Sequence, residues 1–98
     1  MRPRLSESIL KTERVTLCNR LGLHARAASK LVSTAAEFQS DVIVIRDDRR
    51  VNAKSIMGVL MLAAPVGTEL EIECDGPDEK DALKTLVALV KDRFGEGE

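Results

Sequence analysis

Aromatic residues are almost absent from this 98-residue sequence, which has no tryptophan, no tyrosine and only two phenylalanines. Proteins that bind single-stranded nucleic acid commonly stack bases on aromatic side chains, so this composition disfavours such binding. The formal net charge is −1, which also lacks the positive excess of a non-specific nucleic-acid binder. We therefore expect no nucleic-acid partner, and we expect a core of aliphatic side chains.

Long apolar runs and metal-ligand clusters are missing as well. No stretch approaches the roughly 20 apolar residues of a membrane-spanning helix, so we expect no membrane partner and a cytoplasmic location. The two cysteines, Cys18 and Cys74, form no CxxC pair, and a single histidine cannot complete a convincing zinc site with them. We expect two free thiols and no bound metal.

What is present fits one folded domain, with 44% hydrophobic and 32% charged residues. Residues 1–11 show no sustained periodicity and are expected to form an N-terminal extension. Residues 12–94 are expected to form the domain, and residues 95–98 a C-terminal tail. Between Lys11 and Lys30 there are five bases and one acid, so this part of the chain is suited to an anion.

Periodicity predicts four strands and three helices in the order β-α-β-β-α-β-α. Strands are predicted at residues 15–19, at 41–46, around Val51 and at 68–74, and helices at 25–38, at 56–62 and from the turn at 76–78 to Gly95. The alternation at 68–74 places Cys74 inside the protein, whereas Cys18 faces outward. One polar strand face and three helices predict an α+β fold, a two-layer open-faced β-sandwich whose helices cover one face of a mainly antiparallel sheet.

The single histidine, His24, follows Gly22 and lies where the first helix is expected to begin. Backbone N–H groups at a helix start lack partners, and the helix dipole is positive there, so the position suits an anion. A neutral imidazole nitrogen is a nucleophile, and Arg26 can supply a guanidinium for phosphate. The pattern favours a phosphohistidine, although a lone histidine near a helix start is more often structural or simply exposed.

The predicted helix at 56–62 is apolar on every face and follows Ser55, a good N-cap residue. A domain of this size can surround few elements completely, so part of this helix should remain exposed. An exposed apolar patch beside a phosphate site, with adaptable methionine side chains, predicts docking of partner proteins. The predicted docking surface consists of Gly22, Ala25, Ala27, Ile56, Met57 and Leu60.

Two segments resemble a known family. Residues 21–28 read LGLHARAA, and residues 52–59 read NAKSIMGV. The first resembles the active-site segment of the HPr family, the histidine phosphocarriers of the bacterial phosphotransferase system. The second resembles the segment around the regulatory serine of that family, which corresponds to Ser55 here. The resemblance covers about residues 12–94 and includes the predicted order of elements.

The resemblance implies a monomeric phosphoryl carrier that is not itself an enzyme and needs no cofactor. His24 would accept a phosphoryl group on Nδ1 from enzyme I, which is charged by phosphoenolpyruvate, and would pass it to a IIA-type protein. Arg26 would stabilise the phosphate. Ser55 would be phosphorylated where an HPr kinase is present.

One departure from the family pattern leaves the branch of the system open. The sugar-branch pattern usually has Arg-Pro where this chain has Arg26 and Ala27, and Arg-Ala-Ala is more typical of NPr, the nitrogen-branch member. Two other classes of function remain. One is a small α+β ligand-binding module in which His24 is incidental. The other is a hydrolase with His24 as general base, for which no convincing nucleophile or carboxylate lies nearby in the sequence.

Overall fold

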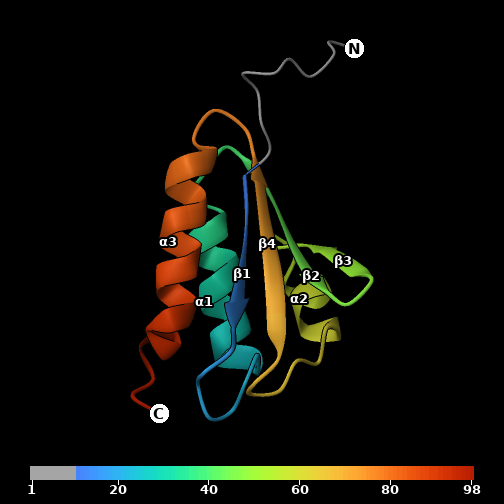
Figure 1. Cartoon of the computed structure of the whole chain (residues 1–98), viewed down its shortest axis with the longest axis vertical. Helices are drawn as coiled ribbons and strands as arrows, with labels where there is room; N and C mark the ends of the chain where they lie inside the picture. Colours follow the sequence, from blue (N-terminus) through green and yellow to red (C-terminus); the bar gives the residue numbers. More distant parts are fainter. Residues whose placement is uncertain (1–10) are drawn as a thin grey trace.

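A four-stranded sheet organises the fold (Figure 1). The computed structural model describes residues 11–98, and its strands are β1 (Lys11–Thr16), β2 (Asp41–Arg46), β3 (Arg49–Asn52) and β4 (Glu69–Asp75). The strands lie in the order β1-β4-β2-β3, and each neighbouring pair is antiparallel. The first and last strands of the chain are therefore neighbours, so the sheet is complete only when β4 lies between β1 and β2.

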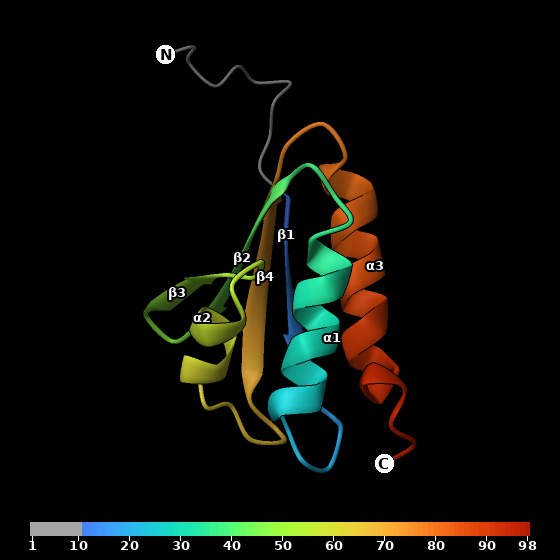
Figure 2. The same ribbon diagram turned by 180° about the vertical axis from the view of Figure 1, so that it is seen from behind.

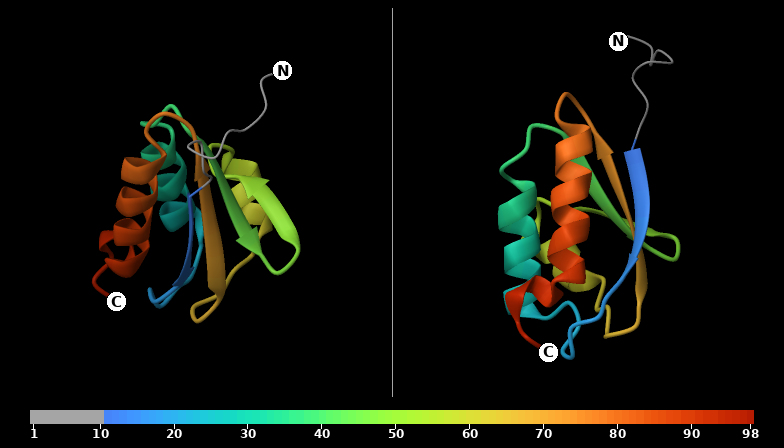
Figure 3. Two further views of the ribbon diagram at one scale, coloured as in Figure 1. Left: turned by 45° about the horizontal axis from the view of Figure 1, so that its top comes forward. Right: turned by 60° about the vertical axis from the view of Figure 1, so that its left-hand side comes forward.

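Helices cover one face of this sheet (Figure 2). They are α1 (Ala25–Ala35), α2 (Ile56–Met61) and α3 (Glu79–Lys91), and a short 3-10 turn, η1, follows at Arg93–Gly95. In Figure 3, α1 and α3 lie side by side, and no helix of the described residues covers the opposite face of the sheet. The predicted order of elements and the predicted open-faced β-sandwich are confirmed. Within residues 11–98, no helix is long and apolar enough to cross a membrane.

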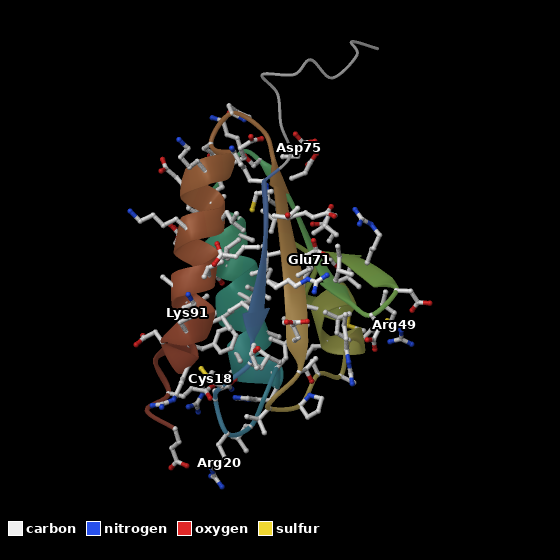
Figure 4. The ribbon with its side chains drawn as sticks, viewed as in Figure 1. Cys18, Arg20, Arg49, Glu71, Asp75 and Lys91 are labelled. Carbon is white, nitrogen blue, oxygen red and sulfur yellow. The ribbon has the colours of Figure 1, made fainter. Side chains whose placement is uncertain are left out.

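The alternation in β4 separates the two faces of the sheet. Leu70, Ile72 and Cys74 are buried toward the helices, whereas Glu71 lies on the open face (Figure 4). In the register with β2, Ile72 pairs with Val44 and Cys74 pairs with Val42, so apolar side chains meet across the strands. As expected, Cys74 is buried, Cys18 is exposed and both thiols are free.

The start of the first strand was predicted wrongly. Strand β1 covers residues 11–16 rather than 15–19, and Lys11, which was assigned to the extension, pairs with Cys74. Residues 1–10 of the predicted extension lie outside the described residues. Because β1 is an edge strand and its first four residues are polar, it lacks the apolar alternation that signals a strand. Its pairing with β4 defines it instead.

Two helix ends were also predicted too late. Helix α1 ends at Ala35 rather than at Phe38, and α3 ends at Lys91 rather than at Gly95. Phe94 fits the helical spacing of α3, yet Arg93 and Phe94 have φ values of 55° and 54°, so the chain turns back there. The ring of Phe94 is still buried in the core, and burial of this side chain favours the turn.

Candidate functional site

His24 is the N-cap residue of α1, as the sequence predicted. Its backbone is extended, with φ −78° and ψ −179°, and its Nδ1 atom accepts a hydrogen bond from the backbone N–H of Arg26 at 3.4 Å. This contact places Nδ1 against the first turn of the helix. Backbone N–H groups without helical partners and the positive end of the helix dipole favour negative charge at that position.

A tight loop between β1 and α1 holds the histidine in place. Gly22 has a φ of +68°, and a Cβ atom there would lie 2.6 Å from the carbonyl oxygen of Ala64. The same oxygen accepts a hydrogen bond from the N–H of Leu23 at 2.9 Å, and the His24 N–H donates to the Gly22 carbonyl at 2.9 Å. Gly22 is buried, so its predicted role in docking is wrong. Glycine is needed for packing inside the protein.

The C-terminal segment brings a carboxylate to the imidazole. His24 Nε2 and Glu96 Oε2 are 2.7 Å apart, and the two side chains are 28% and 10% exposed. The other oxygen, Glu96 Oε1, accepts a hydrogen bond from Asn19 Nδ2 at 3.0 Å, and Nδ2 also donates to the Gly22 carbonyl at 2.7 Å. Figures 1 and 2 both show the C-terminal segment at the same end of the molecule as the β1–α1 loop.

The hydrogen bonds of Glu96 assign the protons on the imidazole. Burial raises the pKa of Glu96, but the hydrogen bonds from Asn19 and His24 and the charges of His24 and Arg26 outweigh it, so the pKa is lowered overall. An ionised carboxylate only accepts hydrogen bonds. Nε2 of His24 is therefore the donor, and Nδ1 carries no hydrogen when the ring is neutral. Acceptance of the Arg26 N–H by Nδ1 agrees with this assignment.

Glu96 is the site residue that the sequence interpretation missed. It is 72 residues from His24 along the chain, in a segment that was expected to be a tail. One signal in the sequence could have indicated that this segment is ordered. Phe94 is an apolar residue that directly precedes the glycines and glutamates of residues 95–98. Its side chain is 1% exposed, and its carbonyl accepts a hydrogen bond from Lys30 Nζ at 2.6 Å. These contacts hold the segment against α1.

Arg26 lies exposed in the first turn of α1. Its guanidinium makes no hydrogen bond or ion pair with any described residue, so it is available for a phosphate. A second base of this loop, Arg20, which is labelled in Figure 4, is already paired. Its Nε lies 2.6 Å from Glu98 Oε1. Of the two arginines, only Arg26 is both close to His24 in sequence and unpaired.

Helix α2 leaves part of its apolar surface exposed, as predicted, but the residues differ in part. Ile56 and Met57 are exposed, whereas Leu60 is partly buried against the core and Ala27 has no exposed surface. The prediction that Ala27 contacts partners is therefore wrong, and Leu60 contributes less than expected. Met61 was not predicted and is 63% exposed. The exposed apolar residues next to His24 and along α2 are Leu21, Ala25, Ile56, Met57 and Met61.

Ser55 caps α2, as predicted. Its Oγ accepts a hydrogen bond from the Gly58 N–H at 3.2 Å, and its side chain is only partly buried. This cap accounts for the serine on structural grounds alone. Among residues 11–98, no group of three or more histidine, cysteine or acidic side chains is arranged to hold a metal ion.

Comparison with known proteins gives a consistent assignment. The family profile described as "PTS HPr component phosphorylation site" matches residues 11–92. The phosphocarrier protein HPr of Cupriavidus necator is 55% identical over 83 residues, which cover 85% of this chain and 93% of that protein. HPr of Neisseria meningitidis serogroup A is 52% identical over 84 residues, covering 86% and 94%. The crystal structure of HPr-C-His from Thermoanaerobacter tengcongensis has a TM-score of 0.87 at 41% identity, covering 90% of this chain and 99% of that one. The chain therefore belongs to the HPr family, the phosphocarrier proteins of the phosphotransferase system.

Proposed function

We propose that this protein accepts a phosphoryl group from enzyme I on Nδ1 of His24 and donates it to a IIA-type protein. The observation that carries the proposal is the position of His24, whose Nδ1 faces the first turn of α1 at 3.4 Å from the Arg26 backbone nitrogen. The helix start and the unpaired Arg26 guanidinium both favour the charge of a transferred phosphoryl group.

The transfer exchanges one nitrogen–phosphorus bond for another. The lone pair of His24 Nδ1 attacks phosphorus on the phosphohistidine of enzyme I. The bond to the donor imidazole breaks, and the donor nitrogen leaves with the electron pair. Arg26 binds oxygens of the phosphoryl group while it moves, so that its charge is balanced in the transition state. Donation to the IIA-type protein is the same exchange with His24 as the leaving group.

Docking of both partners involves the exposed apolar side chains around this site. Leu21, Ile56, Met57 and Met61 offer unbranched or aliphatic surface that different partners can bury. Exposed Ala25 leaves room for a partner to approach His24. We propose that the protein acts as a monomer in the cytoplasm, without nucleic acid, membrane or cofactor. Ser55, at the start of α2, is the proposed site of an HPr kinase where the organism has one.

Whether the protein serves the sugar branch or the nitrogen branch depends on its partner proteins, and the start of helix α1 does not decide it. Ala27 stands where sugar-branch proteins usually carry proline. Its N–H is not among the helical bonds of α1, which begin with the bond from the Ala28 N–H to the His24 carbonyl at 2.8 Å. Proline and alanine are therefore both compatible with this position. We propose sugar transport as the primary role and NPr-like nitrogen regulation as the alternative, and transfer assays with each enzyme I separate them.

The test is incubation with phosphoenolpyruvate and each purified enzyme I paralogue, followed by intact mass measurement. We expect the mass of one phosphoryl group, lost after acid treatment because phosphohistidine is acid-labile, and absent in His24→Ala. Arg26→Ala should slow transfer without changing the melting temperature, while Arg14→Ala, on the sheet, serves as the matched control arginine. Acid-stable label, or label on His24→Ala, contradicts the proposal. A ligand-binding module would take no phosphoryl group at all.

A further inference from the structure

A chain of hydrogen bonds from Asn19 through Glu96 ends at Nε2 of the imidazole, the ring nitrogen that does not react. We propose that Glu96 is a positioning residue that holds the neutral His24 ring with its hydrogen on Nε2, so that Nδ1 carries the lone pair that attacks phosphorus. The inference rests on the proposed function, because it names the residue that prepares its nucleophile.

The geometry requires Glu96 to accept a hydrogen bond with each of its two side-chain oxygens. One hydrogen of Asn19 Nδ2 is donated to the Gly22 carbonyl at 2.7 Å and the other to Glu96 Oε1 at 3.0 Å, so Asn19 presents only a donor to the carboxylate. The second oxygen, Oε2, then faces Nε2 of His24 at 2.7 Å. A carboxylate meets both demands with two accepting oxygens. A carboxamide has a single accepting oxygen and cannot meet both.

Glu96 also stabilises the positive charge that develops on the imidazole during transfer. When Nδ1 forms its bond to phosphorus while Nε2 keeps its hydrogen, the imidazole ring becomes positively charged. The ionised carboxylate 2.7 Å from Nε2 stabilises this charge, and its side chain is only 10% exposed, so water screens the interaction weakly. The proton stays at Nε2 throughout, and the ring returns to neutral when the phosphoryl group leaves.

The segment that carries Glu96 is anchored on either side of it. Phe94 is buried in the core, and its carbonyl accepts a hydrogen bond from Lys30 Nζ at 2.6 Å. After Glu96, the carbonyl of Glu98 accepts from the Arg20 N–H at 2.8 Å. The carboxylate is therefore presented to His24 by a fixed backbone rather than by a free chain end.

The decisive variant is Glu96→Gln, with Glu98→Gln as the matched control. Glutamine keeps the size of the side chain. If its oxygen accepts from Asn19, its amide group turns toward Nε2 and donates to it, which favours the tautomer with hydrogen on Nδ1. Glu98→Gln removes one negative charge from the same segment at an exposed pair with Arg20 that does not touch His24. Both full-length proteins are labelled with ¹⁵N at histidine.

Two measurements are made on the same samples. The ¹⁵N chemical shifts of His24 in the unphosphorylated protein report the tautomer, and rapid-quench kinetics with enzyme I report the transfer rate. We expect hydrogen on Nε2 in the wild type and in Glu98→Gln. We expect hydrogen shifted to Nδ1 in Glu96→Gln, with transfer slowed roughly 10- to 100-fold by loss of a charge-assisted hydrogen bond.

The outcomes separate this inference from the proposed function. A wild-type ring with its hydrogen on Nδ1, or an unchanged tautomer in Glu96→Gln, overturns the positioning role even if His24 is phosphorylated normally. A changed tautomer with an unchanged transfer rate overturns the contribution of Glu96 to transfer. If the wild type accepts no phosphoryl group, the proposed function fails, and so does the contribution of Glu96 to transfer. The ¹⁵N chemical shifts still report whether Glu96 orients the ring.

Discussion

Replacement of Gly22 by alanine tests whether the loop that positions His24 is as tightly packed as the structure shows. Gly22 has a φ of +68°, and the added Cβ would lie 2.6 Å from the Ala64 carbonyl oxygen and 2.8 Å from Pro65 Cα. Both contacts are with backbone, so no flexible side chain can move away. Gly67 is a matched control, since its φ is +90° and nothing lies within 4 Å of the position that its Cβ would occupy.

The two substitutions separate backbone strain from steric overlap. A non-glycine residue at positive φ costs about 1–2 kcal/mol, which is the effect expected for Gly67→Ala. Overlap with a packed backbone adds about 1–3 kcal/mol, so Gly22→Ala should lose about 2–5 kcal/mol in all. At roughly 4–8 °C per kcal/mol for a domain of this size, its melting temperature should fall by about 10 °C or more.

Urea unfolding of both variants under identical conditions gives the comparison, with thermal melting as a second measurement. The Gly22→Ala variant should also transfer phosphoryl groups more slowly, because the Ala64 oxygen that must move also accepts the hydrogen bond of Leu23, next to His24. Equal losses of stability in the two variants would refute the argument, since the difference between them arises only from the contacts of Gly22.

Three other parts of the molecule give further predictions. Near pH 8 a thiol reagent should modify Cys18 but not Cys74, because burial, followed by the charges of two nearby carboxylates, raises the pKa of Cys74 to about 11; modification of both thiols in the folded protein would contradict this. The hydroxyl of Ser40 and neighbouring backbone N–H groups lower the pKa of Asp78, so this carboxylate contributes stability above its ordinary pKa of about 4 and loses it as pH falls through the lower folded value. Asp78→Asn should flatten that acid-dependent loss in urea unfolding, and an unchanged pH profile would argue against the contact. Ser55→Asp should keep or slightly raise stability, because aspartate is also a good N-cap, while phosphotransfer slows as a charge enters the edge of the docking surface. Thermal melting and transfer kinetics on this variant check both parts, and normal kinetics would leave Ser55 with its cap role alone.

Features with local causes could be predicted from the sequence. Ser55 was identified as an N-cap because its residue type and the apolar run after it both indicate a helix start, and the structure confirms the cap. The alternation in β4 predicted the inward side of Cys74 for the same reason. His24 at the start of α1 followed from the glycine before it and the helical spacing after it.

Features that depend on contacts between distant segments could not be predicted from the sequence. The pairing of β1 with β4 joins residues that are far apart in the chain, such as Lys11 and Cys74. Nothing in the polar start of β1 signals this pairing. The contact between His24 and Glu96 depends on the reversal of the chain at Phe94, where a positive φ occurs in a residue that rarely adopts one. Periodicity describes the face of one element and carries no information about which loop meets which terminus.

The proposed transfer depends most on which nitrogen of His24 carries the phosphoryl group, and ¹⁵N–³¹P coupling in the protein phosphorylated by enzyme I identifies that nitrogen directly. A sample labelled with ¹⁵N at its single histidine gives one unambiguous assignment. We predict one-bond coupling to Nδ1 of His24. Nε2 should still carry its hydrogen and donate it to Glu96 in a hydrogen bond. Coupling to Nε2, or a phosphoryl group on any other residue, would contradict the account.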